Sequence, residues 1–287
     1  MPIALIAFDF DPLLRIADGV SVRWQTLALA AVVSLCLAAA GVIARRSNLR
    51  SDDLLYIAIA AAPGAIVGGR IGYLLLVPEA FASGPLSLFD PSVGGLELGL
   101  GVVGGLGTAA VVTSLLGAPV GRWGDAVTIP LLVAIAAGKA TMALGGSGQG
   151  RPSDGSWATA YLGPGPWVDA APAIPSHPAQ IYEAVIVAVI VVALAGLRSL
   201  GLLHAGDGRR LLAGVAGWAL ARAVVSTTWR DPAVLGSLPA GGVLAVVIAA
   251  ASLAGLIALV AWWPRRRRRV EAAAQPAWPD PETRPRF

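Results

Sequence analysis

The amino-acid sequence predicts an all-α membrane protein with seven transmembrane helices, an outer N-terminus and a cytoplasmic C-terminus. Three observations predict this fold: the composition, a series of seven long apolar segments, and the placement of the arginines. Of the 287 residues, 56% are hydrophobic and only 13% are charged, whereas a soluble domain carries about 25% charged residues. The composition therefore excludes an ordinary soluble protein and favours a chain that crosses a membrane several times.

Each predicted span follows from its length, because about 20 apolar residues are needed to cross the hydrocarbon core of a bilayer. Seven segments meet this requirement: 24–44, 54–77, 94–116, 126–144, 180–197, 211–229 and 240–263. They form one transmembrane domain over residues 24–263. Residues 1–23 precede it as an outer segment, in which Asp9 and Asp11 come before any basic residue and argue against a cleaved signal peptide. The chain shows no internal repeat of the kind that builds many transporters.

Arginines follow every second apolar segment, and they set the predicted orientation. They occur after the first, third, fifth and seventh segments, at positions 45, 46, 50, 122, 198, 209, 210 and 265–269. Loops rich in Lys and Arg remain in the cytoplasm. The long loop 145–179, rich in glycine and proline, therefore lies outside. Residues 264–287 are predicted to be a basic, disordered cytoplasmic tail whose arginine run contacts anionic lipid rather than nucleic acid.

Five charged residues lie within the apolar segments or at their ends: Arg70, Glu97, Lys139, Glu183 and Arg222. A charge in the bilayer costs roughly 3 kcal/mol or more, so such residues are candidates for function. At about 1.5 Å per helical residue, all five fall in the outer third of the membrane. We expect a polar pocket, net positive by one, that faces the outer leaflet and binds a lipid phosphate through arginine forks. The alternative is that these charges pair with one another, or that Glu97 and Glu183 reach the membrane surface.

A second polar group, His177-Pro178-Ala179-Gln180-Ile181-Tyr182-Glu183, stands at the entrance of the fifth segment. Imidazole, amide, phenol and carboxylate groups thus gather within a short stretch, although His177 also suits a helix cap before Pro178. Asp125 is expected to cap the start of the fourth segment. The two histidines lie on opposite sides of the membrane, and the single cysteine, Cys36, lies inside a span. No metal site and no cofactor are therefore predicted.

Several short motifs resemble those of one family, prolipoprotein diacylglyceryl transferase. Gly68-Gly69-Arg70-Ile71-Gly72-Tyr73 is similar to its GGRIGY segment, and residues 177–183 are similar to its HPSQLYE. Asp125 with Pro130 resembles its DFIAP stretch, and residues 219–232 resemble its FRxxxExxRxPD ending. The resemblance runs over residues 24–263 and implies a seven-span enzyme of the bacterial cytoplasmic (inner) membrane.

The resemblance also implies a reaction and a set of site residues. The family transfers the diacylglyceryl group of phosphatidylglycerol to the lipobox cysteine of a prolipoprotein signal peptide, and it releases glycerol phosphate. The enzyme needs no nucleophile of its own, and its partners are these two substrates and membrane lipids. The resemblance gives His177, Tyr182 and Arg222 as predicted catalytic residues, and Glu97 is added to them as a hypothesis that the resemblance does not carry. The predicted substrate-binding residues are Arg70, Tyr73, Lys139, Arg151, Gln180, Glu183 and Arg230.

The sequence departs from the family pattern at several reactive positions. The signature GRxGNFxNxExxG reads GKATMALGGSGQG at 138–150, and a family histidine, tyrosine and glutamate correspond to Gly99, Gln25 and Ser226. As a hypothesis, Glu97 supplies a base that is lost elsewhere. The leading prediction is a diverged transferase with reduced or altered activity. Two alternatives stay open: a non-catalytic, phospholipid-binding paralogue that assists lipoprotein processing, and a transporter or other membrane protein.

Overall fold

The computed structural model describes residues 6–274, apart from residues 83, 91, 202, 204 and 205. Within this part of the chain, seven α-helices form a bundle: α1 (Trp24–Arg46), α2 (Asp53–Leu76), α3 (Leu98–Leu115), α4 (Val120–Thr141), α5 (Ala179–Ser199), α6 (Arg209–Ser226) and α7 (Ala240–Ala274). Short 3-10 helices adjoin them: η1 (Pro78–Phe81), η2 (Pro85–Phe89) and η3 (Met142–Leu144). The described strands are also short: β1 (Ile6–Phe8), β2 (Leu13–Ala17), β3 (Val20–Arg23), β4 (Thr159–Tyr161), β5 (Ala233–Leu235) and β6 (Leu238–Pro239).

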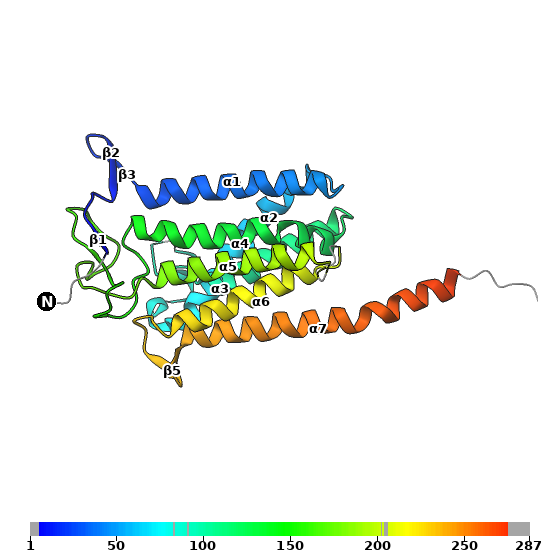
Figure 1. Ribbon diagram of the computed structural model, residues 1–287. Helices are drawn as coiled ribbons and strands as arrows, with labels where there is room; N and C mark the ends of the chain where they lie inside the picture. Colours follow the sequence, from blue (N-terminus) through cyan, green and yellow to red (C-terminus); the bar gives the residue numbers. More distant parts are fainter. Residues whose placement is uncertain (1–5, 83, 91, 202, 204–205, 275–287) are drawn as a thin grey trace, which may run out of the picture.

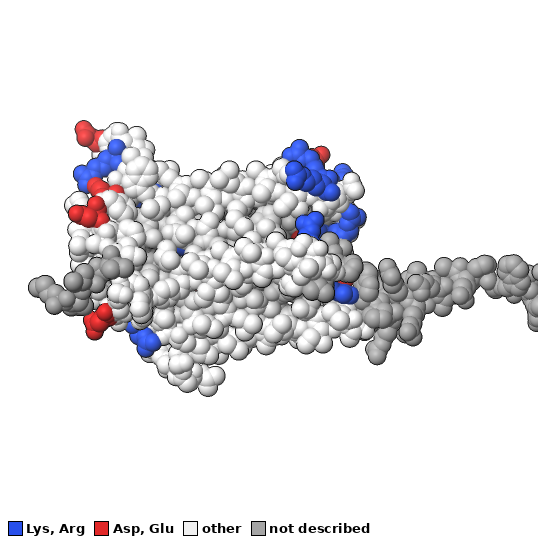
Figure 2. All heavy atoms as spheres, in the orientation of Figure 1, with Lys and Arg blue, Asp and Glu red and all other residues white. Residues whose placement is uncertain are grey.

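The helices run side by side, with β1–β3 at one end of the bundle and the end of α7 beyond the other (Figure 1). Charged side chains gather at these two ends, and the broad band between them is almost free of charge (Figure 2). Among the described helices, six are long and apolar enough to cross a membrane, namely all except α6. The prediction of an all-α, multi-span membrane protein is therefore confirmed.

The helix α6 packs against α4, α5 and α7 in the bundle. Its Trp218 and Ala219 are fully buried, and they belong to the same core as Leu132 of α4 and Val187 of α5. Three arginines make α6 more polar than a typical span. Charges in membrane helices almost always face the interior of a bundle, so the charged residues of α6 mark the place where a site is expected.

The helices α2 and α3 approach each other closely because glycines face one another along their contact. A Cβ atom added to Gly68 would lie 2.2 Å from the carbonyl oxygen of Leu100, and one added to Gly104 would lie 2.2 Å from that of Gly64. Both distances are far shorter than van der Waals contact, so any larger residue would force the helices apart. Small residues at such contacts let membrane helices pack backbone to backbone.

Gly68→Ala is expected to push α2 away from α3 and to lower the free energy of unfolding by about 1–3 kcal/mol, the usual cost of overpacking. The change should lower the midpoint of thermal unfolding in detergent by several degrees. Gly107→Ala is the matched control, because a Cβ atom at Gly107 of α3 meets nothing within 4 Å. Equal midpoints for the two variants would contradict the close packing of α2 and α3.

The N-terminal segment and the loop between α4 and α5 fold together over one end of the bundle. β1 pairs in parallel with β4, so that Ile6 lies opposite Thr159 and Phe8 lies opposite Tyr161. The rings of Phe8 and Tyr161 stack with their centres 4.8 Å apart. β2 and β3 form an antiparallel hairpin that leads into α1. The predicted outer segment 1–23, of which residues 1–5 lie outside the described part, is therefore joined to the loop 145–179.

The helix α7 is longer than the sequence analysis predicts. The last span is expected to end at residue 263 and to be followed by a disordered tail, whereas α7 continues to Ala274. The stretch RRRRRVEAAA at 265–274 consists mostly of strong helix formers, which explains why the helix does not end with the apolar segment. Residues 275–287 of the predicted tail lie outside the described part.

Asp125 caps a different helix from the one predicted. The helix α4 begins at Val120, so Asp125 lies in its second turn and not at its start. The Asp125 carboxylate instead accepts the backbone N–H groups of Gly208 at 3.1 Å and Arg210 at 2.9 Å. It therefore satisfies free amide groups at the start of α6, and it holds α6 against α4.

Candidate functional site

Four of the five intramembrane charges form one buried ionic cluster. Lys139 Nζ lies 2.9 Å from Glu183 Oε2, and Arg222 Nη1 lies 3.4 Å from the same oxygen. Arg222 Nη2 lies 3.0 Å from Glu97 Oε1. The charges therefore pair with one another, as the alternative prediction held. Two cations face two carboxylates, so the cluster is electrically balanced and not net positive as expected, because the fifth charge, Arg70, lies elsewhere.

Glu97 is held at the start of α3, where it is the N-cap residue. Its carboxylate accepts the backbone N–H groups of Gly99 and Leu100, both at 2.7 Å. This position favours a negative charge because the free amides of the first helical turn point toward it. Gly72 of α2 leaves room for the side chain, since a Cβ atom there would lie 2.8 Å from Glu97 Cβ. Glu97 is only 5% exposed and does not reach the membrane surface.

Glu183 of α5 lies between the two cations of the cluster. It is 1% exposed, so the expectation that it reaches the membrane surface is wrong. Besides its contacts with Lys139 and Arg222, its Oε1 accepts a hydrogen bond from Trp218 Nε1 at 3.2 Å. The packing of α5 against both α4 and α6 brings these groups together. A carboxylate buried this deeply is tolerated because cations and a donor surround it.

Arg222 of α6 connects both carboxylates, and its guanidinium also stacks on an aromatic ring. The guanidinium carbon lies 4.7 Å from the centre of the Trp229 ring, which is within the range of a cation–π contact. Its Nε atom has no hydrogen-bond partner among the described residues. One N–H group of the guanidinium is therefore buried without a hydrogen bond in the cluster.

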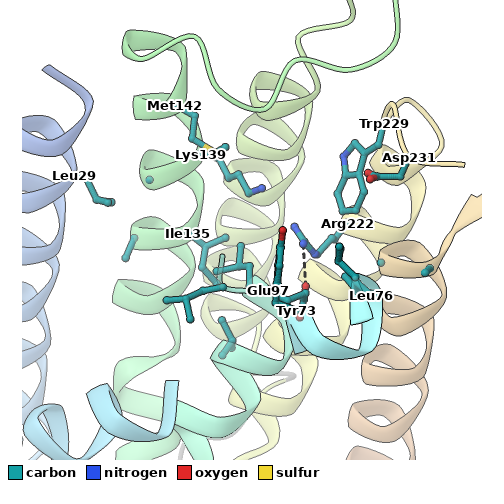
Figure 3. A pocket seen from close by; sticks show the side chains of 18 of the residues that line it. Leu29, Tyr73, Leu76, Glu97, Ile135, Lys139, Met142, Arg222, Trp229 and Asp231 are labelled. Carbon is teal, nitrogen blue, oxygen red and sulfur yellow. Dashed lines mark hydrogen bonds and ion pairs between the residues drawn. The ribbon is translucent and has the colours of Figure 1, made fainter. Parts of the chain in front are cut away.

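A cavity of about 750 Å³ lies beside the cluster, and Glu97, Lys139 and Arg222 line it. Its other lining side chains come from several helices and are mostly apolar, as Figure 3 shows for Leu29 and Ile135. A cavity of this size and lining suits the acyl chains of a lipid.

A second cavity, of about 200 Å³, adjoins the first. Four residues line both cavities: Lys139, Arg222, Trp229 and Asp231. The remaining residues of the small cavity are mostly polar or small: Gly148, Gln149, Ala179, Gln180, Glu183 and Arg230. The ionic cluster therefore stands between a large apolar compartment and a small polar one.

Arg70 belongs neither to the cluster nor to the lining of the two cavities. Its Nε donates to the carbonyl of Leu88 at 2.8 Å, and its Nη2 donates to the carbonyls of Ser87 at 2.9 Å and Asp90 at 2.7 Å. Its Nη1 donates to the carbonyl of Val93. Arg70 thus holds the loop between α2 and α3 in place, and its donors are directed at this loop rather than at a lipid phosphate.

His177 and Tyr182 contact each other, but neither lines the large or the small cavity. His177 Nδ1 lies 3.2 Å from the Tyr182 hydroxyl, and both side chains are half-buried. The backbone of His177 also bonds to Gly150 and Arg151, so the residue ties α5 to the preceding loop. The structure therefore does not bring this predicted catalytic pair to the ionic cluster.

Of the remaining predicted substrate-binding residues, three line one of the two cavities and one, Arg151, lines neither. Tyr73 lines the large cavity, while Gln180 and Arg230 line the small one. Arg230 also forms an ion pair of 2.7 Å with Asp169 of the outer loop. Arg151 donates to a backbone carbonyl just after α6 and lines neither cavity.

Sequence reasoning did not single out three polar or aromatic residues that line the cavities: Gln149, Trp229 and Asp231. Trp229 lies in the bend after α6, which ends at Ser226, so a helical period does not place its side chain. Asp231 comes two residues later, in the turn after α6. Gln149 lies in a loop, where no helical or strand period indicates which way a side chain points.

Comparison with known proteins gives one consistent result. Residues 12–258 match the sequence profile of prolipoprotein diacylglyceryl transferase. The chain is 29% identical to the phosphatidylglycerol–prolipoprotein diacylglyceryl transferase of Paramagnetospirillum magneticum, over 91% of this chain and 97% of the relative. It is 27% identical to that of Nitrobacter hamburgensis, over 96% of each chain. With that of Pseudoalteromonas atlantica it shares 28% identity, and the match spans 63% of the length of that relative.

Proposed function

Because the chain belongs to the prolipoprotein diacylglyceryl transferase family, we propose that it transfers the diacylglyceryl group of phosphatidylglycerol to the lipobox cysteine of a bacterial prolipoprotein. The observation that supports this most strongly is the position of Arg222 and Lys139 where an apolar and a polar cavity meet. A phospholipid bound there would extend its acyl chains into the large cavity and its headgroup into the small one. Its phosphate oxygens would meet an arginine fork and an ammonium group.

In the proposed reaction, the sulfur of the substrate cysteine forms a bond with the glyceryl carbon that bears the phosphate. The bond from this carbon to the phosphate oxygen breaks, and glycerol phosphate leaves with the electron pair. The thiol proton passes to a carboxylate or to water. Arg222 and Lys139 stabilise the negative charge that grows on the leaving oxygen. The nucleophile belongs to the substrate, so the enzyme needs no cysteine or serine nucleophile of its own.

In this proposal, Glu97 positions Arg222 and does not remove the thiol proton. Its oxygens already accept hydrogen bonds from Gly99, Leu100 and Arg222. The hypothesis from the sequence makes Glu97 a base that replaces one lost at Gly99. A Cβ atom on Gly99 would lie only 3.0 Å from Glu97 Oε2, so the carboxylate does occupy the space beside this glycine. The two roles differ in how the reaction depends on pH.

Glu97→Gln is expected to slow transfer roughly tenfold or more. The neutral amide no longer forms an ion pair with Arg222, so the guanidinium that stabilises the leaving phosphate is held less firmly. The measurement is the initial rate with a lipobox peptide and phosphatidylglycerol as a function of pH. If Glu97 only positions Arg222, the Glu97→Gln variant is slower and its pH profile keeps the same shape. Loss of the limb that rises with pH would instead identify Glu97 as the base, and an unchanged rate would reject both roles.

We further infer that α6 is a seventh span, and that the end of the bundle that carries β1–β4 lies outside the cytoplasmic membrane. The packing of α6 against three neighbouring helices supports the first inference. The second rests on the basic residues at positions 45, 46, 50, 122, 198, 209 and 210, which all lie where helices meet the opposite end of the bundle. The positive-inside rule places that end in the cytoplasm. The ionic cluster then lies near the outer leaflet.

The electrical balance of the ionic cluster favours a second function, that of a non-catalytic protein that binds phospholipid. Glu97 and Glu183 already neutralise the two cations that would otherwise attract a phosphate. Three positions at which the family carries reactive groups hold Gly99, Met142 and Ser226 in this chain. A non-catalytic protein that holds phospholipid and assists lipoprotein processing would have such a site.

Mass spectrometry of a lipobox peptide, incubated with the purified chain and phosphatidylglycerol, separates the two functions. A transferase adds the mass of a diacylglyceryl group to the peptide, and it leaves a control peptide with serine in place of the cysteine unchanged. Phosphatidylglycerol that co-purifies or binds without any mass shift on the cysteine peptide identifies the phospholipid-binding paralogue.

A further inference from the structure

Two glutamine side chains with unsatisfied oxygens line the small cavity. Gln149 comes from the loop after α4 and Gln180 from the first turn of α5, and they are 6% and 2% exposed. In each, the amide oxygen Oε1 is buried and has no hydrogen-bond partner among the described residues. A buried acceptor without a donor is unfavourable, so both oxygens suit a ligand that donates hydrogen bonds.

The strand β4 holds both amides in place. Gln149 Nε2 donates to the backbone carbonyl of Thr159 at 3.0 Å, and since a carbonyl only accepts, this bond fixes which end of the amide remains free. Gln180 Nε2 donates to the hydroxyl of Tyr161 at 3.2 Å. Burial raises the pKa of Tyr161 to about 12, so this hydroxyl is neutral at physiological pH. The two free oxygens therefore belong to rigidly supported side chains.

Three cationic side chains, Lys139, Arg222 and Arg230, line the small cavity beside the carboxylates of Glu183 and Asp231. Two of these cations also pair with carboxylates from outside the lining, Arg222 with Glu97 and Arg230 with Asp169. The lining therefore offers hydrogen-bond donors to a phosphate rather than a surplus of positive charge. The group that fits both these donors and the amide oxygens is a phosphate joined to hydroxyl donors.

We propose that the small cavity is the headgroup subsite, and that Gln149 and Gln180 select phosphatidylglycerol by accepting hydrogen bonds from its glycerol hydroxyls. The cavity of about 200 Å³ has room for several water molecules at roughly 30 Å³ each, and thus for a small polar headgroup. Glycerol phosphate offers the same chemistry after its release. The inference rests on the proposed function, because it takes phosphatidylglycerol as the lipid substrate.

Native mass spectrometry of the purified full chain in detergent tests this selection with two lipids. Dioleoylphosphatidylglycerol carries the headgroup hydroxyls, and dioleoylphosphatidylpropanol lacks them. The unmodified chain is expected to bind the first lipid about tenfold more tightly, and Gln149→Leu should reduce this preference to within about twofold. The affinity of Gln149→Leu for phosphatidylpropanol should stay unchanged, which shows that its fold and its phosphate contacts are retained.

A second arm distinguishes the lipid headgroup from the released product. Glycerol phosphate and propyl phosphate compete with the bound lipid in the same measurement. Stronger competition by glycerol phosphate, lost in Gln149→Leu, shows that the product also occupies the subsite. If glycerol phosphate and propyl phosphate compete equally, the subsite recognises the headgroup hydroxyls of the intact lipid and not those of the released product.

Two further variants keep the proposal testable if Gln149→Leu does not fold. Gln149→Asn keeps the amide and withdraws it by one methylene, and it should lose the preference in the same way. Ser199→Ala is the control, because Ser199 is exposed at the end of α5 opposite to Gln180 and donates only to the carbonyl of Gly196 at 2.7 Å, and it should keep the preference. A tenfold preference retained in both Gln149 variants would overturn the proposal. A chain that selects phosphatidylglycerol and transfers nothing would contradict the proposed function alone.

Discussion

Replacing Arg222 with alanine is expected to slow diacylglyceryl transfer by about 100-fold or more, as the loss of a donor to a developing anion usually does. The Arg222 guanidinium bridges Glu97 and Glu183 and lines both cavities. Without it, the leaving phosphate loses the arginine fork, and the two carboxylates are left with Lys139 as their partner in the cluster. The measurement is the initial rate of transfer from phosphatidylglycerol to a lipobox peptide.

Two control variants accompany Arg222→Ala. Arg222→Lys keeps the positive charge and lacks the planar fork, so it should recover only a small part of the lost rate. Arg15→Ala removes an arginine whose side chain is 71% exposed and pairs with Asp11, and it should transfer at the normal rate. Normal transfer by an Arg222→Ala protein that unfolds at the usual temperature would exclude the guanidinium from the mechanism.

Glu183→Gln is expected to cause the largest loss of stability, about 3–5 kcal/mol in the free energy of unfolding. The Glu183 carboxylate is 1% exposed and contacts both Lys139 and Arg222. Its replacement by an amide leaves two buried cations with the single carboxylate of Glu97. The midpoint of thermal unfolding in detergent should fall by roughly 10 °C.

A second substitution tests whether this loss comes from the unpaired charge. Lys139→Met, added to Glu183→Gln, should restore part of the stability because it removes a cation that has lost its partner. Glu79→Gln changes an exposed glutamate of η1 in the same way and should leave the midpoint unchanged. Fully additive losses for Lys139→Met and Glu183→Gln would contradict the ion pair between them.

Much of the fold could be predicted from the sequence because the length of an apolar segment is a local property. The predicted span 54–77 differs from α2 by one residue at each end. The shared depth of Glu97, Lys139, Glu183 and Arg222 follows from the rise of a helix, and these four residues do form one cluster. The end of α7 was harder to predict, because arginine and alanine continue a helix beyond the membrane as well as within it.

The partners of individual side chains could not be predicted, because they depend on loops and on neighbouring helices. Arg70 comes from a motif that resembles the family and lies at the depth of Arg222, yet its donors meet the carbonyls of the loop 87–93. Successive residues of a helix point about 100° apart, so Tyr182 need not face the cluster that Glu183 joins. Asp125 caps α6 because α4 begins earlier than the apolar pattern indicates.

The release of glycerol phosphate from phosphatidylglycerol, measured together with the thioether formed on a lipobox peptide, tests most directly whether the ionic cluster supports a transferase. We predict that the purified chain releases one glycerol phosphate for each modified cysteine, and that it releases none with the serine peptide. Arg222→Ala should slow the formation of both products by about 100-fold or more. Saturable binding of phosphatidylglycerol by the unmodified chain, without release of glycerol phosphate in the presence of the cysteine peptide, would contradict the proposed transfer.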